Sequence, residues 1–233
     1  MEFQRSKEQL KIIRNAYDDT VERYNNGLSD LDFLPDEFKE SAEFKRFRDL
    51  MSTCNSGDPG IKDYLEPKNG LRYLDIGSCL NLMEYDLYQW PSNYYGIDIS
   101  QKLIRVAKSF INTNRIKIGG LLVAEISNLP FDNNYFDIAS AIGVLEYYEL
   151  AYITQALKEL NRILKRKGKL VIDMPNERHP DIHTMVEYES YLGRTRKNIP
   201  SEDEFVDELK RFFIIDKVAD AQIMIQYFAR KRG

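Results

Sequence analysis

Cysteine and long apolar segments are both scarce in this sequence. Its 233 residues include two cysteines, Cys54 and Cys79, which argues against a disulfide framework and is typical of a reducing compartment. No apolar run approaches the ~18 residues that a membrane-spanning helix requires. The N-terminal stretch "MEFQRSKEQLKIIRNAY" carries charges throughout and lacks the pattern of a signal peptide. We therefore expect a soluble, cytoplasmic protein.

An excess of basic residues is also missing. The chain has 33 lysines and arginines against 37 aspartates and glutamates, with a formal net charge of -4, whereas a nucleic-acid-binding face must neutralise phosphates. Short basic clusters occur at 165–167, 194–197 and 230–232, and we interpret them as solvated surface. The composition argues against a nucleic-acid partner and leaves the oligomeric state open.

Residues 1–66 show no strand-like run. In "SKEQLKIIRNAYDDTVERY" the apolar residues recur at helical intervals, and "LPDEFKESAEFKRFRDLM" predicts a further helix that begins near Pro35. The stretch "STCNSGDPG" ends that helix. We predict an N-terminal helical cap over residues 1–66.

After Pro67 the pattern changes to strands alternating with helices. The predicted strands are "LRYLDIG", "NYYGIDI", "GGLLVAEI", "FDIASAIGV" and "GKLVIDMP". Helical segments between them, such as "SQKLIRVAKSFINTN", predict right-handed βαβ units on a parallel sheet. A helix from about Glu149 to Arg166 is expected to end near Gly168. After a helix at "EDEFVDELKR", the runs "FFIIDKVAD" and "IMIQYFARK" predict two adjacent antiparallel strands at the sheet edge.

Three residues of distinct chemistry follow the first three strands. Gly77 allows a close backbone approach, Asp98 can accept hydrogen bonds from two ribose hydroxyls, and Glu125 can accept one from an adenine amine. Ser100 is well placed to cap the helix that begins at Gln101. Ligands of open α/β sheets bind beyond the carboxyl ends of the strands, so the order and spacing of the three residues favour an adenosine site.

The segments "YLDIGS", "YYGIDIS", "LPFDNNYFDIASAIGVLEYYE" and "LNRILKRKGKLVIDMPN" resemble class I S-adenosylmethionine-dependent methyltransferases, and the small-molecule ubiquinone and menaquinone methylating group in particular. The resemblance covers about residues 70–175. It implies an α/β, Rossmann-like, seven-stranded and mostly parallel sheet with an antiparallel last strand and helices on both faces. Residues 67–233 would then form the S-adenosylmethionine-binding domain, with 176–200 as a loop on the acceptor side.

The resemblance also implies which residues hold the cofactor. Asp75 and Gly77 match the first motif, Asp98 the ribose-binding acid, and Glu125 stands where the family usually has Asp. The remaining candidates for cofactor binding are Tyr17, Tyr24, Ser78, Cys79, Asn81, Ile99, Ile126, Ile142 and Gly143.

The first motif departs from the family where glycines are replaced by Cys79 and Asn81. A dinucleotide needs close backbone N–H groups for its pyrophosphate, whereas S-adenosylmethionine has no phosphate, and Ser78 and Asn81 can contact its amino-acid end. The altered loop therefore argues more against an NAD-dependent oxidoreductase than against a methyltransferase. It also leaves a non-catalytic, cofactor-binding sensor as an alternative.

Acceptor-side candidates come from two segments. "EYYE" places Glu146, Tyr147 and Tyr148 near the expected sulfonium, and the 176–200 segment contains His179 and His183. We name Tyr147, His179 and His183 as catalytic candidates, with a role for the histidines as base or acceptor-orienting groups open against surface packing. A zinc site at the two histidines lacks a third ligand, so no metal is expected. Arg194, Arg196 and Lys197 can receive an acidic acceptor or lie in a solvated loop, and Tyr188 and Tyr191 lie in the same segment.

Overall fold

The computed structural model describes residues 2–51, 56–196, 198–220 and 222–233. Cys54 and Lys197 therefore lie outside the described residues, and the prediction for Lys197 has no structural counterpart. None of the helices in these ranges is both long and apolar enough to cross a membrane.

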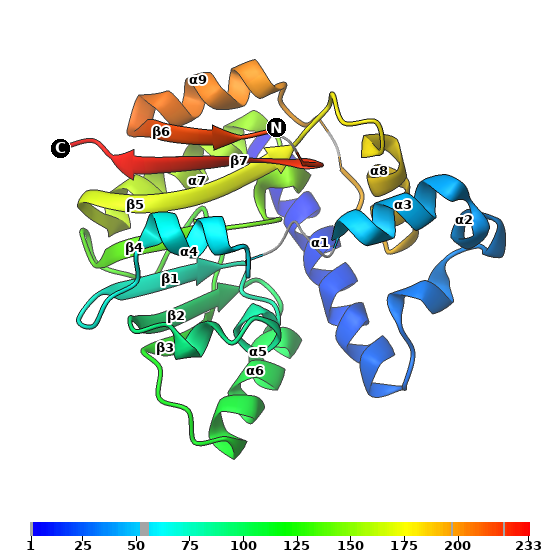
Figure 1. The fold of residues 1–233 in the computed structure, drawn as a ribbon, viewed down its shortest axis with the longest axis horizontal. Helices are drawn as coiled ribbons and strands as arrows, with labels where there is room; N and C mark the ends of the chain where they lie inside the picture. Colours follow the sequence, from blue (N-terminus) through cyan, green and yellow to red (C-terminus); the bar gives the residue numbers. More distant parts are fainter. Residues whose placement is uncertain (1, 52–55, 197, 221) are drawn as a thin grey trace.

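A seven-stranded sheet forms the centre of the molecule (Figure 1). The strand order is β3-β2-β1-β4-β5-β7-β6. The first five strands pair in parallel, and β7 runs antiparallel to both of its neighbours, β5 and β6. The sheet prediction, including the antiparallel pair at the edge, is confirmed. The strands are β1 (Arg72–Ile76), β2 (Asn93–Asp98), β3 (Gly120–Val123), β4 (Phe136–Ala141), β5 (Leu164–Pro175), β6 (Phe213–Ala219) and β7 (Met224–Lys231).

Helices cover both faces of this sheet, and a further group lies at the carboxyl ends of the parallel strands (Figure 1). The helices are α1 (Glu2–Asn25), α2 (Asp36–Glu40), α3 (Ala42–Met51), α4 (Pro59–Leu65), α5 (Asn81–Glu84), α6 (Gln101–Thr113), α7 (Leu150–Ile163), α8 (Ile182–Tyr191) and α9 (Glu202–Phe212). Short 3-10 turns are η1 (Asp30–Phe33), η2 (Leu87–Gln89) and η3 (Leu145–Tyr147).

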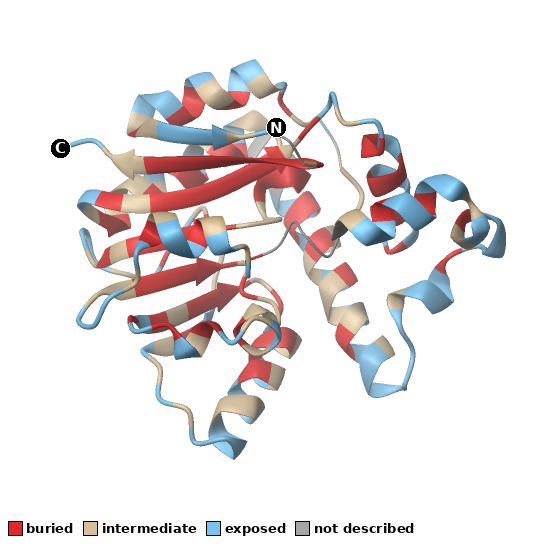
Figure 2. Ribbon diagram, in the orientation of Figure 1, coloured by how far each residue is buried: buried red, intermediate tan, exposed pale blue. Residues whose placement is uncertain are grey.

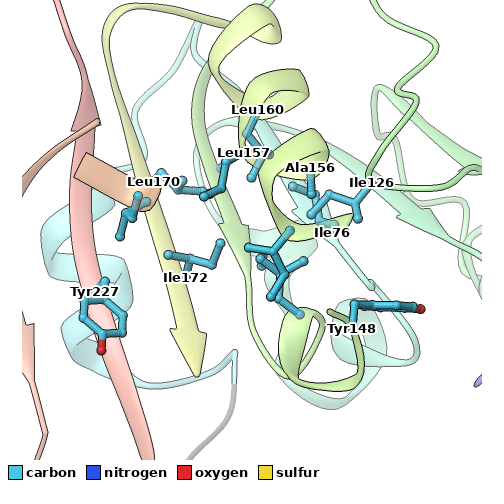
Figure 3. Close-up of a cluster of buried hydrophobic side chains, with 14 of the residues drawn as sticks. Ile76, Ile126, Tyr148, Ala156, Leu157, Leu160, Leu170, Ile172 and Tyr227 are labelled. Atoms are coloured by element: carbon cyan, nitrogen blue, oxygen red, sulfur yellow. The ribbon is translucent and has the colours of Figure 1, made fainter. Parts of the chain in front are cut away.

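Alternation along the strands divides the core into two layers. In β1, Leu74 and Ile76 face the layer that contains α1, α7 and α9, while Tyr73 faces the layer that contains α4, α5 and α6. Successive strand residues point to opposite faces, so a strand buried on both sides is apolar throughout. Figure 2 shows the central strands as buried and the outer faces of the helices as exposed. Figure 3 shows Leu157 and Leu160 of α7 packed towards Leu170 and Ile172 of β5.

A third apolar cluster joins segments that are distant in the sequence. Phe38, Phe44 and Phe47 of α2 and α3 pack against Met185 and Tyr188 of α8. The same cluster includes Ile223 and Met224 at the start of β7. Within residues 1–66, α4 instead packs on the sheet, and α1 contributes to the sheet layer as well as to the cap.

The structure corrects three local predictions. Helix α7 ends at Ile163, and Gly168 lies inside β5, where a Cβ would approach Lys165 O and Asp137 O to 2.9 and 3.0 Å. Gly168 therefore does not cap the helix. It lies in an irregular part of β5, where the β4–β5 register shifts. The helix predicted after Pro35 is two helices, because Ser41 is extended and caps α3 by accepting from Phe44 N–H at 3.1 Å. The 176–200 segment contains the ten-residue helix α8.

Candidate functional site

The strand order reverses between β1 and β4, and a cavity lies beyond the carboxyl ends of the strands at this point. This first cavity has a volume of about 250 Å³, and α1 and α8 approach the same end of the sheet (Figure 1). It is the position that binds ligands in open α/β sheets. Predicted residues that line it are Tyr17, Gly77, Cys79, Asn81, Asp98, Ile99, Ile126, Ile142, Gly143 and Tyr147.

Gly77 makes the turn that leaves β1. Its φ is +65°, in the left-handed region, and a Cβ at this position would lie 2.5 Å from Val144 Cγ2. Both the backbone conformation and the contact therefore require glycine. The turn allows the Val144 side chain to pack directly against the backbone at the wall of the first cavity.

Replacing Gly77 with alanine is expected to destabilise the protein more than the same change at Gly70. Gly70 also has a positive φ, +88°, but nothing lies within 4 Å of its would-be Cβ. Both variants carry the left-handed strain of about 1–2 kcal/mol, and only Gly77→Ala adds an overpacking cost of about 1–3 kcal/mol. Urea unfolding of both variants measures the difference, and equal losses of stability would contradict the assigned Val144 contact.

Asp98 ends β2 with a buried carboxylate that is fixed by backbone donors. Its oxygens accept from Cys79 N–H at 2.9 Å and from Ser100 N–H at 2.8 Å. Burial raises the pKa of Asp98 to about 6, against the lowering effect of these hydrogen bonds. Each carboxylate oxygen has a second lone pair for a ligand hydroxyl. Ser100 caps α6 by accepting from Leu103 N–H at 3.0 Å, as predicted.

Asp75 lies behind the wall of the first cavity. Its carboxylate accepts from the Tyr94 hydroxyl at 2.8 Å and from Asn81 Nδ2 at 3.5 Å. Burial raises the pKa of Asp75 to about 7. Asn81 lines the cavity, and its Nδ2 donates to Ser56 Oγ at 3.0 Å as well as to this carboxylate. Ser78 is buried next to Gly96, and its hydroxyl has no hydrogen-bond partner in the described part of the chain.

Besides Asp75 and Ser78, four further predicted residues lie outside the lining of the first cavity. Glu125 follows β3, and its half-exposed carboxylate lies 3.7 Å from the Arg14 guanidinium of α1. Tyr24, in the last turns of α1, is 77% exposed. His179 accepts from Asp181 N–H at 3.2 Å, and His183 lies on the exposed side of α8 in a groove with α2. In the described ranges no three His, Cys, Asp or Glu residues are grouped as a metal site would require.

Tyr147 does line the first cavity and belongs to a buried polar network. Its hydroxyl donates to Glu189 Oε2 at 3.0 Å and lies 3.3 Å from the Tyr17 hydroxyl. Burial raises the pKa of Tyr147 well above its usual value, so this phenol stays protonated near neutral pH. Tyr147 therefore acts as a hydrogen-bond donor and connects η3 to α1 and α8.

Other lining residues have no local sequence signal that marks them. Glu189 comes from α8 and Ile13 from α1, and both reach the cavity only because their helices fold over the strand ends. Glu146 and Tyr148 are exceptions, because "EYYE" follows a predicted strand. The additional lining residues are Ile13, Ile76, Ile97, Ala124, Val144, Glu146, Tyr148, Tyr152 and Glu189.

A second cavity, of about 220 Å³, adjoins the first. The two share Asn81, Ile142, Gly143, Glu146 and Glu189 as lining residues. The second cavity extends from this shared wall to Asp173 at the end of β5 and to the cluster of α3, α8 and β7. The site thus consists of two adjoining compartments above the strand ends.

These features define a Rossmann-like domain with a ligand site at the topological switch point. Residues 74–172 match the methyltransferase-domain family. This match and the strand order agree with the resemblance of the sequence to class I S-adenosylmethionine-dependent methyltransferases.

Individual relatives are consistent with this assignment. The chain is 26% identical over 156 residues to sterol 4-C-methyltransferase strm-1 of Caenorhabditis elegans, covering 56% of this chain and 45% of that protein. It is 37% identical over 78 residues to demethylmenaquinone methyltransferase of Thermotoga maritima, covering 33% and 31%. The chain thus spans less than half the length of these curated relatives. A solved SAM-dependent methyltransferase from Methanosarcina mazei shares the fold with a TM-score of 0.59, 21% identity, and coverage of 75% of this chain and 97% of that one.

The residues that line the first cavity suit S-adenosylmethionine. Asp98 offers acceptor oxygens to ribose hydroxyls, and Ile97, Ile99 and Ile126 give an apolar lining suited to an adenine ring. No lysine or arginine is among the described residues that line it, which suits a ligand without phosphates better than a dinucleotide. Gly77 lines the cavity with backbone alone, and Val144 packs beside it.

Proposed function

We propose that the protein transfers a methyl group from S-adenosylmethionine to a small molecule. The observation that carries this proposal is the pair of adjoining cavities, of which the first suits the cofactor and the second an acceptor. The names of the sterol and demethylmenaquinone methyltransferases support a small acceptor. The scarcity of cysteine supports action in the cytoplasm.

In this proposal the residues of the first cavity hold and orient the cofactor. Asp98 binds the ribose hydroxyls, Ile99 and Ile126 contact the adenine, and Gly77, Cys79 and Asn81 surround the amino-acid end. S-adenosylmethionine supplies a methyl group on a positively charged sulfur, which a nucleophile displaces in line. Ile142 and Gly143, shared by both cavities, then set where donor and acceptor meet. Alignment and exclusion of water are the main tasks of the protein.

The helical cap closes the site in our proposal. Tyr17 of α1 lines the first cavity, and Arg194 lies 4.6 Å above its ring. Helices α2, α3 and α8 form one apolar cluster over the second cavity. We therefore assign the cap to α1, α2, α3 and α8, with α4 belonging to the sheet domain.

Two measurements test the proposal. Calorimetry with S-adenosylhomocysteine should give a dissociation constant in the range of roughly 1–100 µM, equivalent to about 5.5–8 kcal/mol. Transfer of labelled methyl to a low-molecular-weight cell extract should then exceed that of the Asp98→Ala variant. Absence of binding would defeat the proposal, whereas binding without transfer would favour the non-catalytic sensor.

Replacing Tyr17 with alanine is expected to weaken binding of S-adenosylhomocysteine by about tenfold, which corresponds to ~1.4 kcal/mol. The reason is that Tyr17 closes one side of the first cavity and holds the Tyr147 hydroxyl. Tyr24→Ala, on the same helix but 77% exposed, is the matched control and should bind within about twofold of the wild type. Calorimetry checks both variants, and equal effects would remove α1 from the cofactor site.

A further inference from the structure

The second cavity has two chemically different walls. Phe47, Met185, Ile223 and Met224 form an apolar wall from α3, α8 and the β7 end. Glu146, Asp173 and Glu189 form an acidic wall, and Arg196 is the one cation among its described lining residues. A molecule that fills this cavity must therefore present an apolar body to one side and a polar group to the other.

Two of the three acids already have cationic partners. Glu146 forms an ion pair with Arg196, and both side chains are almost fully buried. Glu189 lies 3.5 Å from Arg194 Nη1 and accepts from the Tyr147 hydroxyl. Each pair leaves its carboxylate neutralised within the protein.

Asp173 differs from these two acids. It is 2% exposed, and its Oδ1 accepts from Gly143 N–H at 2.8 Å. In the described ranges no lysine or arginine forms an ion pair with it, although the charge of Arg196 in the same wall lowers its pKa in part. A buried carboxylate without a cation is costly, so Asp173 is the group in this wall that a positively charged ligand would stabilise.

Arg196 is the cation of this wall and is paired with Glu146. Its side chain is 4% exposed and lines the second cavity. While its Nη2 is bound to Glu146, its Nε–H has no hydrogen-bond partner among the described residues. Buried Nε–H groups without a hydrogen-bond partner also occur at Arg14, Arg23 and Arg194 among the described residues, and an ammonium cannot accept from such a donor, so Arg196 does not contribute to the recognition of an amine.

We propose that the second cavity binds a small apolar amine and that Asp173 receives its nitrogen as the methyl acceptor. This inference rests on the proposed methyltransferase function and narrows it to nitrogen acceptors. Gly143, which binds Asp173 through its N–H, lines both cavities, so the amine would lie at the junction of the two.

Proton transfer follows from this arrangement. An ammonium ion has no lone pair for attack, so it must first lose a proton, and the Asp173 carboxylate accepts it to become a carboxylic acid. The neutral amine nitrogen then forms a bond to the methyl carbon as the carbon–sulfur bond breaks, and the electron pair of that bond stays on sulfur. The product is a methylated ammonium, and Asp173 returns its proton to water.

The pKa of Asp173 suits this exchange. Burial, and then the nearby Glu146, raise it to about 8. A carboxyl group with this pKa is about half ionised at pH 8, so at that pH a substantial fraction of Asp173 can accept a proton, whereas at pH 6 the group is already protonated. The other titratable and charged groups around it in the cavity wall are Glu146, Glu189, Tyr85 and Arg196.

Three matched probes test the inference: 2-phenylethylamine, 2-phenylethanol and 3-phenylpropanoate, which share a ring and differ in charge. Binding is measured by saturation-transfer NMR titration on the full chain saturated with S-adenosylhomocysteine at pH 8. The amine is expected to bind at least about tenfold more tightly than the alcohol or the acid. Equal binding of the three, preference for the carboxylate, or no binding at 10-mM-scale concentrations would overturn the inference.

Variants assign the charge preference to Asp173. Asp173→Asn should reduce the preference to about twofold or less, and Asp173→Glu should restore part of it. Asp216→Asn makes the same change at a carboxylate of β6 that forms an ion pair with Arg230 of β7. This control variant should leave the preference intact. If Asp173→Asn does not fold, the wild-type probe series and Asp173→Glu still decide the matter. A preference that survives Asp173→Asn in folded protein would overturn the assignment to this residue.

The two levels of the proposal fail in different ways. Loss of S-adenosylhomocysteine binding in the wild type would defeat the methyltransferase function and the acceptor role with it. Tight S-adenosylhomocysteine binding without amine preference would leave the methyltransferase in place and reject only the nitrogen acceptor.

Discussion

Replacing Asp98 with alanine is expected to weaken binding of S-adenosylhomocysteine by about 100- to 10,000-fold. Hydrogen bonds to a charged group contribute about 1.5–3 kcal/mol each, and the carboxylate can accept one from each of two ribose hydroxyls. The substitution also releases Cys79 N–H and Ser100 N–H, which now fix the turn after β1 and the start of α6. Calorimetry measures the loss, and thermal unfolding shows whether the variant remains folded.

The pH dependence of this binding has a defined direction. Because the pKa of Asp98 is raised to about 6, the carboxyl is protonated at pH 5 and accepts fewer hydrogen bonds. Affinity for S-adenosylhomocysteine should therefore rise between pH 5 and pH 7 in the wild type, and this rise should be absent from Asp98→Ala. Asp216→Ala on β6 controls for the loss of one carboxylate. A folded Asp98→Ala variant that binds within threefold of the wild type would rule out the ribose role.

Replacing Asp173 with asparagine is expected to stabilise the protein at pH 8 and to have little effect at pH 4. The folded-state pKa of Asp173 is raised from 3.8 to about 8. Between these values the unfolded chain loses the proton while the folded protein retains it, so this group makes stability fall as pH rises from about 4 to 8. One pKa unit corresponds to about 1.4 kcal/mol, so the gain from Asp173→Asn at pH 8 is on the order of 2–5 kcal/mol.

Urea unfolding at pH 4, 6 and 8 measures this gain. The stability difference between variant and wild type should grow through this range, whereas Asp216→Asn should show no such growth. A variant less stable than the wild type at pH 8 would show that the Asp173 carboxylate is stabilised in the fold and would contradict the raised pKa. If the prediction holds, the Asp173 side chain reduces the stability of the protein while it supplies a carboxyl group to the second cavity. Such a loss of stability is common at functional sites.

Much of the fold follows from local sequence patterns. The apolar runs of β1, β2, β4 and β5 and the amphipathic helices between them alternate in a way that only a mostly parallel sheet accommodates. The antiparallel pair of β6 and β7 at one side of the sheet was also predictable, because two strand-like runs follow α9 with a short connection. The end of α7 was not, because Gly168 resembles a helix cap and serves a strand irregularity that depends on Asp137 of the neighbouring strand.

Part of the site was predictable for the same reason. Gly77 and Asp98 follow neighbouring parallel strands, whose carboxyl ends must meet at one edge of the sheet. Glu125 follows β3 by the same rule, yet the structure pairs its side chain with Arg14 of a helix more than 100 residues earlier in the sequence. A strand-end position fixes where the backbone lies, and it does not fix which partner the side chain finds.

The sequence by itself determined which segments form strands, that most of them pair in parallel, and which residues follow the strand ends. These features depend on alternation and on turn chemistry within a few residues. The tertiary structure alone decided that Phe47, Glu146, Asp173, Glu189 and Arg196 surround one cavity. These residues come from five separate segments, and only the packing of α3 and α8 against the start of β7 brings them together. The burial that raises the pKa of Asp173 is likewise a product of that packing, since desolvation depends on all the atoms that surround a group.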